Sequence, residues 1–252
     1  MKLFTRQFTP YFITQALGAL NDNLFKNALV LLLTYQTAAF DTNLDAGTIA
    51  SLAAGLFILP FGLFSGAGGH LADHYDKATL IRIFKCFELV IMVIAALGFW
   101  LSSFSVLMLC VFLMGAQSAF FGPVKYSILP ASLKQSVLMK ANGWVEMATF
   151  MMILLGTILA GVLASSGSAA SIVASILGLS ALGLWASLKV PACPPLSTAH
   201  WQWSVLWKSN VTAFRAAREV KSVWLSVLGI SWFWFIGALV LAQLPDLAKN
   251  YL

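Results

Sequence analysis

The sequence predicts an all-α polytopic membrane protein. Of its 252 residues, 60% are hydrophobic and only 10% are charged, which is more apolar material than the core of a soluble domain can bury. The apolar residues also fall in runs of about 20, the length that crosses a bilayer as a helix, and nearly all charges lie in the breaks between runs. The net charge of +6 is therefore interpreted as membrane topology rather than as a nucleic-acid surface.

The apolar runs predict seven spans in chain order, at about 11–35, 49–71, 79–101, 106–121, 144–164, 169–188 and 223–244. Six spans, a longer polar connection and a seventh span outline a transporter built from two six-helix halves. We therefore expect three parts: a six-helix transmembrane half (1–189), a cytoplasmic amphipathic linker (190–221) and the first helix of a truncated C-terminal half (222–252).

The linker is expected to lie on the membrane surface, because aromatic and basic side chains alternate along it and flank a span. These residues are Trp201, Trp203, Trp207 and Phe214 among Lys208, Arg215, Arg218 and Lys221. With the N-terminus in the cytoplasm, all 15 Lys and Arg residues except Lys26 and Lys249 fall on the cytoplasmic side. The N-terminal run lacks a cleavage pattern, so it is expected to be a retained helix.

The first span carries the most costly residues. A charge at bilayer depth costs about 2.5 to 3.5 kcal/mol, so such residues usually face a bundle interior or a wet cavity. Gln15, Asp22 and Lys26 share one face of the predicted helix, with Gly18 and Ala19 between them. This stripe predicts the wall of a pathway. The alternative is that Asp22 and Lys26, four residues apart, form an ion pair that only allows the helix to insert.

The fourth span supplies two further polar candidates. Lys125 follows Gly122 and Pro123, where proline frees backbone groups and a cation could meet a phosphate or a carboxylate such as Glu146. The alternative is that Lys125 is one more topological lysine. Gln117 lies deeper and could donate hydrogen bonds into a cavity.

Two acidic residues are expected to form structural ion pairs. Glu146 opens the fifth span, where it complements the helix dipole and could pair with Lys140. Glu88 lies in the first turns of the third span, near Arg82 and Lys85. A proton-carrying role for Glu146 is the alternative.

The loop GHLADHYDK, from Gly69 to Lys77, resembles the loop signature of the major facilitator superfamily, Gly-x-Leu-Ala-Asp-Arg-x-Gly-Arg-Arg. Its Gly, Leu, Ala and Asp fit, whereas His74 and Asp76 depart from the pattern. The resemblance implies a conformational or gating role for Gly69, Asp73 and Lys77, and none for Asp76.

Three segments together resemble the lysophospholipid transporter branch of that superfamily: LGALNDN from Leu17, GPVKYSILP from Gly122 and KANGWVE from Lys140. The seventh span resembles variants fused to acyltransferase and acyl-carrier-protein synthetase domains, although it lacks the arginine of the separate type. The resemblance implies flipping of lysophospholipid, such as 2-acyl-glycerophosphoethanolamine, across the bacterial inner membrane for reacylation. The implied partners are the lipid, the bilayer, the missing C-terminal half and a fused or neighbouring acyltransferase. The substrate-binding candidates are Gln15, Asp22, Asn23, Lys26, Gln117 and Lys125.

Two other functions stay open: a proton-coupled facilitator for a small solute or drug, and a membrane anchor for a fused acyltransferase. Catalysis by this chain is not expected, because none of His70, His74 and His200 has the Asp five residues later that glycerolipid acyltransferases need. There is also no phosphate-binding glycine loop. The three cysteines are scattered, so neither a metal nor another cofactor is expected.

Overall fold

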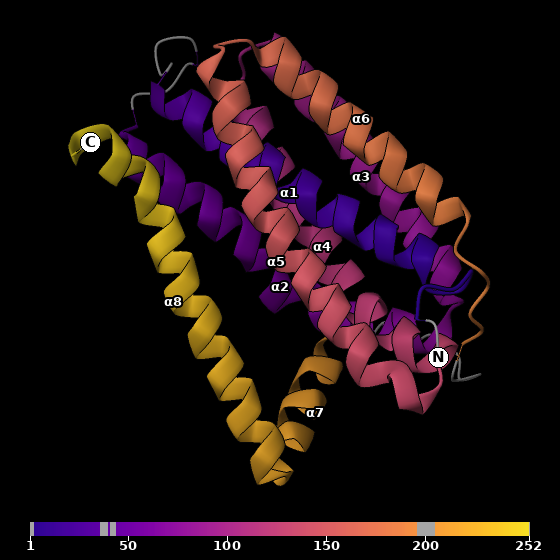
Figure 1. Ribbon diagram of the computed structural model, residues 1–252. Helices are drawn as coiled ribbons and strands as arrows, with labels where there is room; N and C mark the ends of the chain where they lie inside the picture. Colours follow the sequence, from indigo (N-terminus) through magenta and orange to yellow (C-terminus); the bar gives the residue numbers. More distant parts are fainter. Residues whose placement is uncertain (1–2, 36–39, 41–43, 196–204, 252) are drawn as a thin grey trace.

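A computed structural model describes residues 3–35, 40, 44–195 and 205–251, and these residues form eight helices (Figure 1). Each predicted span coincides with a helix, and the eighth helix, α7, falls in the predicted linker. The helices are α1 (Thr9–Tyr35), α2 (Ala46–His74), α3 (Lys77–Trp100), α4 (Phe104–Ser132), α5 (Gln135–Ser165), α6 (Ala169–Leu188), α7 (Val205–Glu219) and α8 (Lys221–Tyr251).

The structure does not by itself confirm the count of seven spans. Among the described residues, five helices are long and apolar enough to cross a membrane, namely α2, α4, α5, α6 and α8. The helices α1 and α3 have 27 and 24 residues and carry charges near their middles. The arrangement of six spans plus one therefore stays a prediction.

Two helices extend further than the apolar runs predict. The helix α4 continues through Pro123 and Pro130 to Ser132, and α5 already begins at Gln135. Proline is tolerated in such helices because neighbouring groups satisfy the backbone groups that it frees. An apolar run measures only the part of a helix that lies in lipid, so it misses the polar turns beyond.

Aspartates begin α2 and α3. Asp45 accepts hydrogen bonds from the backbone nitrogen of Thr48 at 2.9 Å and from its hydroxyl at 2.6 Å. These bonds lower the pKa of Asp45. Asp76 caps α3 in the same way, accepting from the backbone nitrogen of Thr79 at 2.7 Å. Since caps satisfy the free N–H groups of a first turn, both starts are well defined.

Glycines allow α2 and α4 to approach closely. A Cβ atom built on Gly115 of α4 would overlap the backbone carbonyl of Phe57 in α2. A Cβ atom on Gly68 of α2 would lie 2.9 Å from the carbonyl oxygen of Phe120 in α4. Small residues at such crossings are typical of helix packing in lipid. The other main contacts join α1 to α5 and α6, and α3 to α4 and α6.

The bundle contains two apolar cores at different levels. One includes Leu29 and Met92, and the other includes Phe8, Ile81 and Val124. Between the residues of these cores, along α1, α3, α4, α5 and α6, lie polar side chains that we call the polar layer. The polar layer consists of Gln15, Asn21, Asp22, Lys85, Glu88, Gln117, Ser118, Thr149 and Ser180.

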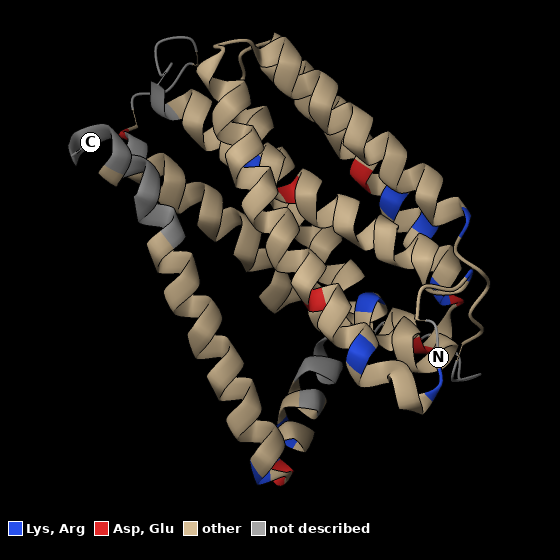
Figure 2. Cartoon of the chain, in the orientation of Figure 1, with Lys and Arg blue, Asp and Glu red and all other residues tan. Residues whose placement is uncertain are grey.

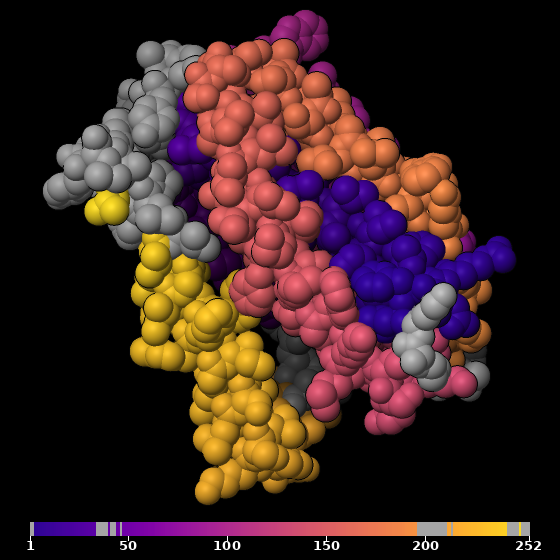
Figure 3. Space-filling view, in the orientation of Figure 1, coloured from indigo at the N-terminus to yellow at the C-terminus, as the bar shows by residue number. Residues whose placement is uncertain are grey.

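The last two helices extend from the main bundle, and Figure 3 shows α8 as an arm beside it. Within this arm, Phe214 of α7 packs edge-on against Trp224 of α8, with ring centroids 5.0 Å apart. Phe150 of α5 stacks on Trp234 of α8 at 5.5 Å. Apart from such contacts the described face of α8 is exposed and apolar, as expected of a helix in lipid.

The basic residues gather toward the end of the bundle that holds the N-terminus (Figure 2). This clustering agrees with a topology in which these charges lie on one side of the membrane. Lys2, Trp201 and Trp203 lie outside the described residues, and the side chains of Trp207, Lys208 and Lys249 are likewise not described. The cytoplasmic position of that side stays a prediction.

Candidate functional site

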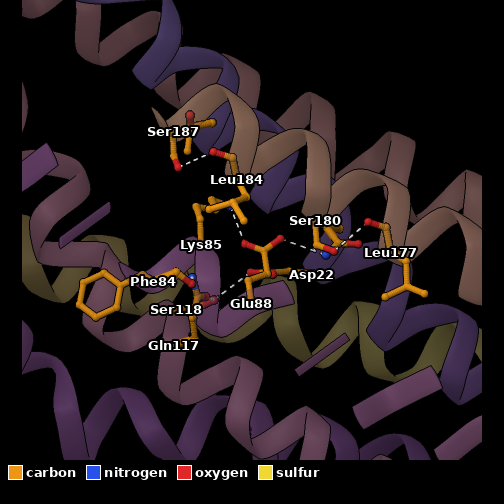
Figure 4. A network of polar contacts seen from close by, with 12 residues as sticks. Asp22, Phe84, Lys85, Glu88, Gln117, Ser118, Leu177, Ser180, Leu184 and Ser187 are labelled. Carbon is orange, nitrogen blue, oxygen red and sulfur yellow. Dashed lines mark hydrogen bonds and ion pairs between the residues drawn. The ribbon is translucent and has the colours of Figure 1, made fainter. Parts of the chain in front are cut away.

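Five neighbouring residues of the polar layer are what we call the acidic network: Asn21, Asp22, Lys85, Glu88 and Ser118. Figure 4 labels Asp22, Lys85, Glu88 and Ser118. At the centre of the network, the ammonium of Lys85 lies 2.5 Å from Oε2 of Glu88, and both side chains are only 1% exposed. The other carboxylate oxygen of Glu88 accepts a hydrogen bond of 3.0 Å from the amide of Asn21. The acidic network therefore joins α3 to α1 through a buried ion pair.

Asp22 belongs to this network but has no cation in contact. Its Oδ2 accepts a 2.8 Å hydrogen bond from the Ser118 hydroxyl of α4, and its buried Oδ1 has no hydrogen-bond partner among the described residues. The ammonium of Lys26 lies 4.9 Å from the ring centroid of Phe57 in α2. The described residues thus show no Asp22–Lys26 ion pair within 4 Å. The structure does not support the interpretation of these two residues as a pair that only aids insertion.

Gly18 makes room for the buried lysine. A Cβ atom on Gly18 of α1 would overlap the ammonium of Lys85, whereas one on Gly183 of α6 would be in ordinary van der Waals contact with it at 3.7 Å. Larger residues at Gly18 would force the lysine to move. Gly18, predicted to line a pathway, therefore also accommodates a charge from α3.

A second group, the Lys125 network, consists of Gln15, Lys125, Tyr126, Glu146 and Thr149. The ammonium of Lys125 donates to the Thr149 hydroxyl at 2.9 Å, and that hydroxyl lies 3.3 Å from Oε1 of Gln15. Gln15 is 2% exposed, and its Nε2 has no hydrogen-bond partner among the described residues. Tyr126 donates to Glu146 at 2.6 Å. The network joins α1, α4 and α5 and keeps a free donor beside a cation.

Of the two acidic residues expected in structural ion pairs, Glu88 forms one, with Lys85 rather than Arg82, and Glu146 forms none among the described residues. In the described part of the chain, the one acid–base pair within 4 Å is Lys85–Glu88. Arg82 instead donates to the backbone carbonyl of Val190 at 2.8 Å. Neither Arg82 with Glu88 nor Lys140 with Glu146 forms a pair, because six residues along a helix place the side chains on different faces. The pair that does form has the favourable spacing of three.

Two of the proposed substrate-binding amides use their donors inside the bundle. Asn23 donates to the carbonyl of Ala19 on its own helix at 2.8 Å. Gln117 is 7% exposed and donates to the carbonyl of Phe84 in α3 at 3.3 Å. Both residues lie next to the acidic network. The side-chain oxygen of Gln117 also accepts a hydrogen bond from the Ser118 hydroxyl at 3.3 Å. The roles of both residues in binding stay predictions.

In the turn between α2 and α3, Asp76 makes the contacts that the sequence did not predict. Its Oδ2 accepts a 2.6 Å hydrogen bond from the backbone nitrogen of Cys193, and the nitrogen of Lys77 donates to the Cys193 carbonyl at 3.0 Å. Burial raises the pKa of the Cys193 thiol. Asp73 is exposed, and Gly69 has open space at its Cα. The turn is thus tied to the segment after α6.

Sequence reasoning missed the residues that partner the predicted ones. Ser118, Thr149 and Tyr126 hold Asp22, Lys125 and Glu146, respectively. Hydroxyl residues in membrane helices commonly bond to their own backbone, so they give no signal of a distant partner. The cap role of Asp76 did have a signal, because an aspartate just before a helical apolar run is a typical N-cap.

Comparisons with known proteins agree with this architecture. The sequence pattern of the Major Facilitator Superfamily matches residues 11–251. Two relatives are the Lysophospholipid transporter LplT of Yersinia pestis (strain Pestoides F) and that of Yersinia pseudotuberculosis serotype O:3 (strain YPIII). Each is 27% identical over 236 residues, which cover 93% of this chain and 55% of the relative. The chain therefore spans about half the length of these relatives.

Proposed function

Because the chain belongs to the Major Facilitator Superfamily, we propose that this multi-pass membrane protein moves lysophospholipid, such as 2-acyl-glycerophosphoethanolamine, across a bacterial inner membrane. The lipid would be flipped toward the cytoplasmic face and reacylated by a fused or neighbouring acyltransferase. The names of the matched Yersinia proteins support this substrate class. Residues 1–189 would form one half of the transporter, with a cytoplasmic N-terminus, and 222–252 would begin the other half.

The observation that carries the proposal is the polar layer between two apolar cores. A lysophospholipid needs a polar path for its headgroup and an apolar one for its acyl chain. The layer offers a free donor at Nε2 of Gln15 and a free acceptor at Oδ1 of Asp22. Because a buried polar group without a partner costs about 1–3 kcal/mol, a ligand that satisfies these atoms recovers free energy on binding.

The roles within the layer follow from charge. Lys125 and Gln15 would hold the headgroup phosphate, since the Lys125 ammonium donates to the Thr149 hydroxyl and that hydroxyl donates to Oε1 of Gln15, which leaves Nε2 of Gln15 as a donor for a ligand. Asp22 and Lys26 would complete the polar path, with Asn23 and Gln117 beside them. Transporters of this kind bind substrate near the bilayer midplane between their halves.

The turn from Gly69 to Lys77 would act in conformational change rather than in binding. Asp73 is exposed and therefore free to brace another part of the transporter. Asp76 instead holds the turn against Cys193. We therefore propose that Asp73 contacts another part of the transporter during conformational change, while Asp76 stabilises the turn through its hydrogen bond from Cys193.

The test measures flipping in vesicles that contain the complete product of the reading frame encoding this chain. Fluorescent lysophospholipid is followed as albumin extracts it from the outer leaflet. We expect Asp22→Asn and Lys125→Gln to lower the rate at least ten-fold, because each removes a charge from the layer. Lys134→Gln, an exposed cation on the same side, is the control and should keep the rate. Unchanged transport in both site variants would refute the site assignment.

A second function is favoured by one feature, the buried Asp22 carboxylate without a cation in contact. Such a group could carry a proton in a facilitator for a small solute. Uptake that follows the proton gradient and ignores lysophospholipid would support this function. The reading frame beyond residue 252 distinguishes the two transport functions from the hypothesis of a membrane anchor for an acyltransferase. Five more spans there would support a transporter, and soluble enzyme sequence would support an anchor.

A further inference from the structure

The Lys125 network presents opposite charges side by side on two helices. Lys125 and Tyr126 are consecutive on α4, while Glu146 and Thr149 lie one turn apart on α5. Lys125 contacts Thr149, and Tyr126 contacts Glu146. The contact between Tyr126 and Glu146 thus places a carboxylate near Lys125, where the phosphate is proposed to bind.

These two charges are held apart rather than paired. Lys125 and Glu146 are not within 4 Å of each other in the described structure. The ammonium of Lys125 lies 5.1 Å from the ring centroid of Tyr126, and the hydroxyl of the same ring holds Glu146. The tyrosine therefore acts as a spacer between cation and anion.

The carboxylate is also within reach of a ligand. The contact between Tyr126 and Glu146 is exposed, Tyr126 is 47% exposed, and Glu146 and Lys125 are each half-buried. Gln15 lies behind them, 2% exposed, with its Nε2 free of partners among the described residues. The network therefore offers donors at one end and an acceptor at the other.

We propose that Glu146 and Tyr126 form a subsite for the ammonium of a zwitterionic phosphoethanolamine headgroup, beside Lys125 and Gln15, which bind its phosphate. This inference rests on the proposed lysophospholipid transport. The ethylene bridge of that headgroup joins a phosphate and an ammonium at short range, which matches a cation and a carboxylate separated by one aromatic ring. A carboxylate and an aromatic face are the groups that bind ammonium ions most favourably.

The subsite makes Glu146 a specificity-determining residue. A phosphoglycerol headgroup has no cation for Glu146, and its own negative charge is repelled there. A charge-assisted hydrogen bond to a carboxylate corresponds to roughly a ten-fold difference in affinity or more. The chain should therefore prefer ethanolamine over glycerol headgroups.

The experiment compares flipping of lysophosphatidylethanolamine and lysophosphatidylglycerol by the complete gene product in vesicles. We expect Glu146→Gln to lower the ratio of the two rates about ten-fold while the glycerol lipid is still moved. Tyr126→Ala, which removes the aromatic face of the subsite, should also lower the ratio. Asp45→Asn, a carboxylate change at the N-cap of α2 outside the proposed subsite, is the control and should keep the wild-type ratio.

The outcomes separate this inference from the proposed function. If the wild type moves neither lipid, lysophospholipid transport and the subsite are both refuted. If it moves lipid but Glu146→Gln leaves the ratio unchanged, or lowers both rates equally, only the subsite is refuted. If Glu146→Gln does not fold, Tyr126→Ala decides: a lowered ratio supports the subsite, and an unchanged ratio refutes it.

Discussion

Replacing Lys85 by Met should strongly destabilise the bundle. The ammonium lies 2.5 Å from the Glu88 carboxylate, and each side chain is 1% exposed. An exposed pair would contribute at most about 1 kcal/mol, whereas removing one member of a buried pair costs about 3–5 kcal/mol because the other charge stays buried. In this variant Glu88 would keep only the hydrogen bond from Asn21. We therefore expect a loss of about 3–5 kcal/mol.

The measurement is the free energy of unfolding of the purified chain, from titration with sodium dodecyl sulfate in mixed micelles, followed by tryptophan fluorescence. Lys85→Met, Glu88→Leu and the double variant complete a double-mutant cycle. The double variant should be close to the wild type in stability, since it removes both charges. Losses below about 1 kcal/mol in both single variants, or additive losses in the double one, would refute the buried pair.

Other variants test the packing and the turn. Gly115→Ala should destabilise the chain by about 1–3 kcal/mol, because its Cβ would overlap the Phe57 carbonyl, which cannot move easily; Gly122→Ala, with open space on the same helix, should be neutral in the same titration. Asp76→Ala should cost about 0.5–2 kcal/mol for the lost cap. The same variant should speed thiol labelling of Cys193, because the Asp76 carboxylate accepts a hydrogen bond from the Cys193 backbone nitrogen. Unchanged labelling would show that this hydrogen bond does not restrain the segment after α6.

The sequence predicted the helices well because apolar runs report directly on which segments lie in lipid. It could not predict where the helices end, since α4 and α5 continue into polar turns whose stability comes from tertiary contacts. Tyr11, for example, donates to the backbone carbonyl of Lys125 at 2.7 Å, across 114 residues. A contact of this range has no local pattern, so it becomes visible only in the folded chain.

The candidate site was predictable in part. The stripe of Gln15, Asp22 and Lys26 was found because three polar residues at helical spacing stand out in an apolar run. Their partners come from three different helices. Gln15 contacts Thr149 of α5, Asp22 contacts Ser118 of α4, and Lys26 lies over the ring of a phenylalanine in α2. Which helix faces each position depends on the packing of the bundle, which periodicity in one helix does not specify.

The charges of α1 and α3 differ in a way that separates structure from function. On α3, Lys85 and Glu88 neutralise each other, so their buried charges are satisfied without a ligand. On α1, Asp22 and Lys26 have favourable spacing but contact Ser118 and an aromatic ring instead. Charges that are buried and not neutralised cost free energy, and a transporter retains them where a substrate uses them. Lys85→Met should therefore reduce stability and Asp22→Asn should reduce transport while the fold is kept. If Asp22→Asn is as unstable as Lys85→Met, the charges of both helices are structural.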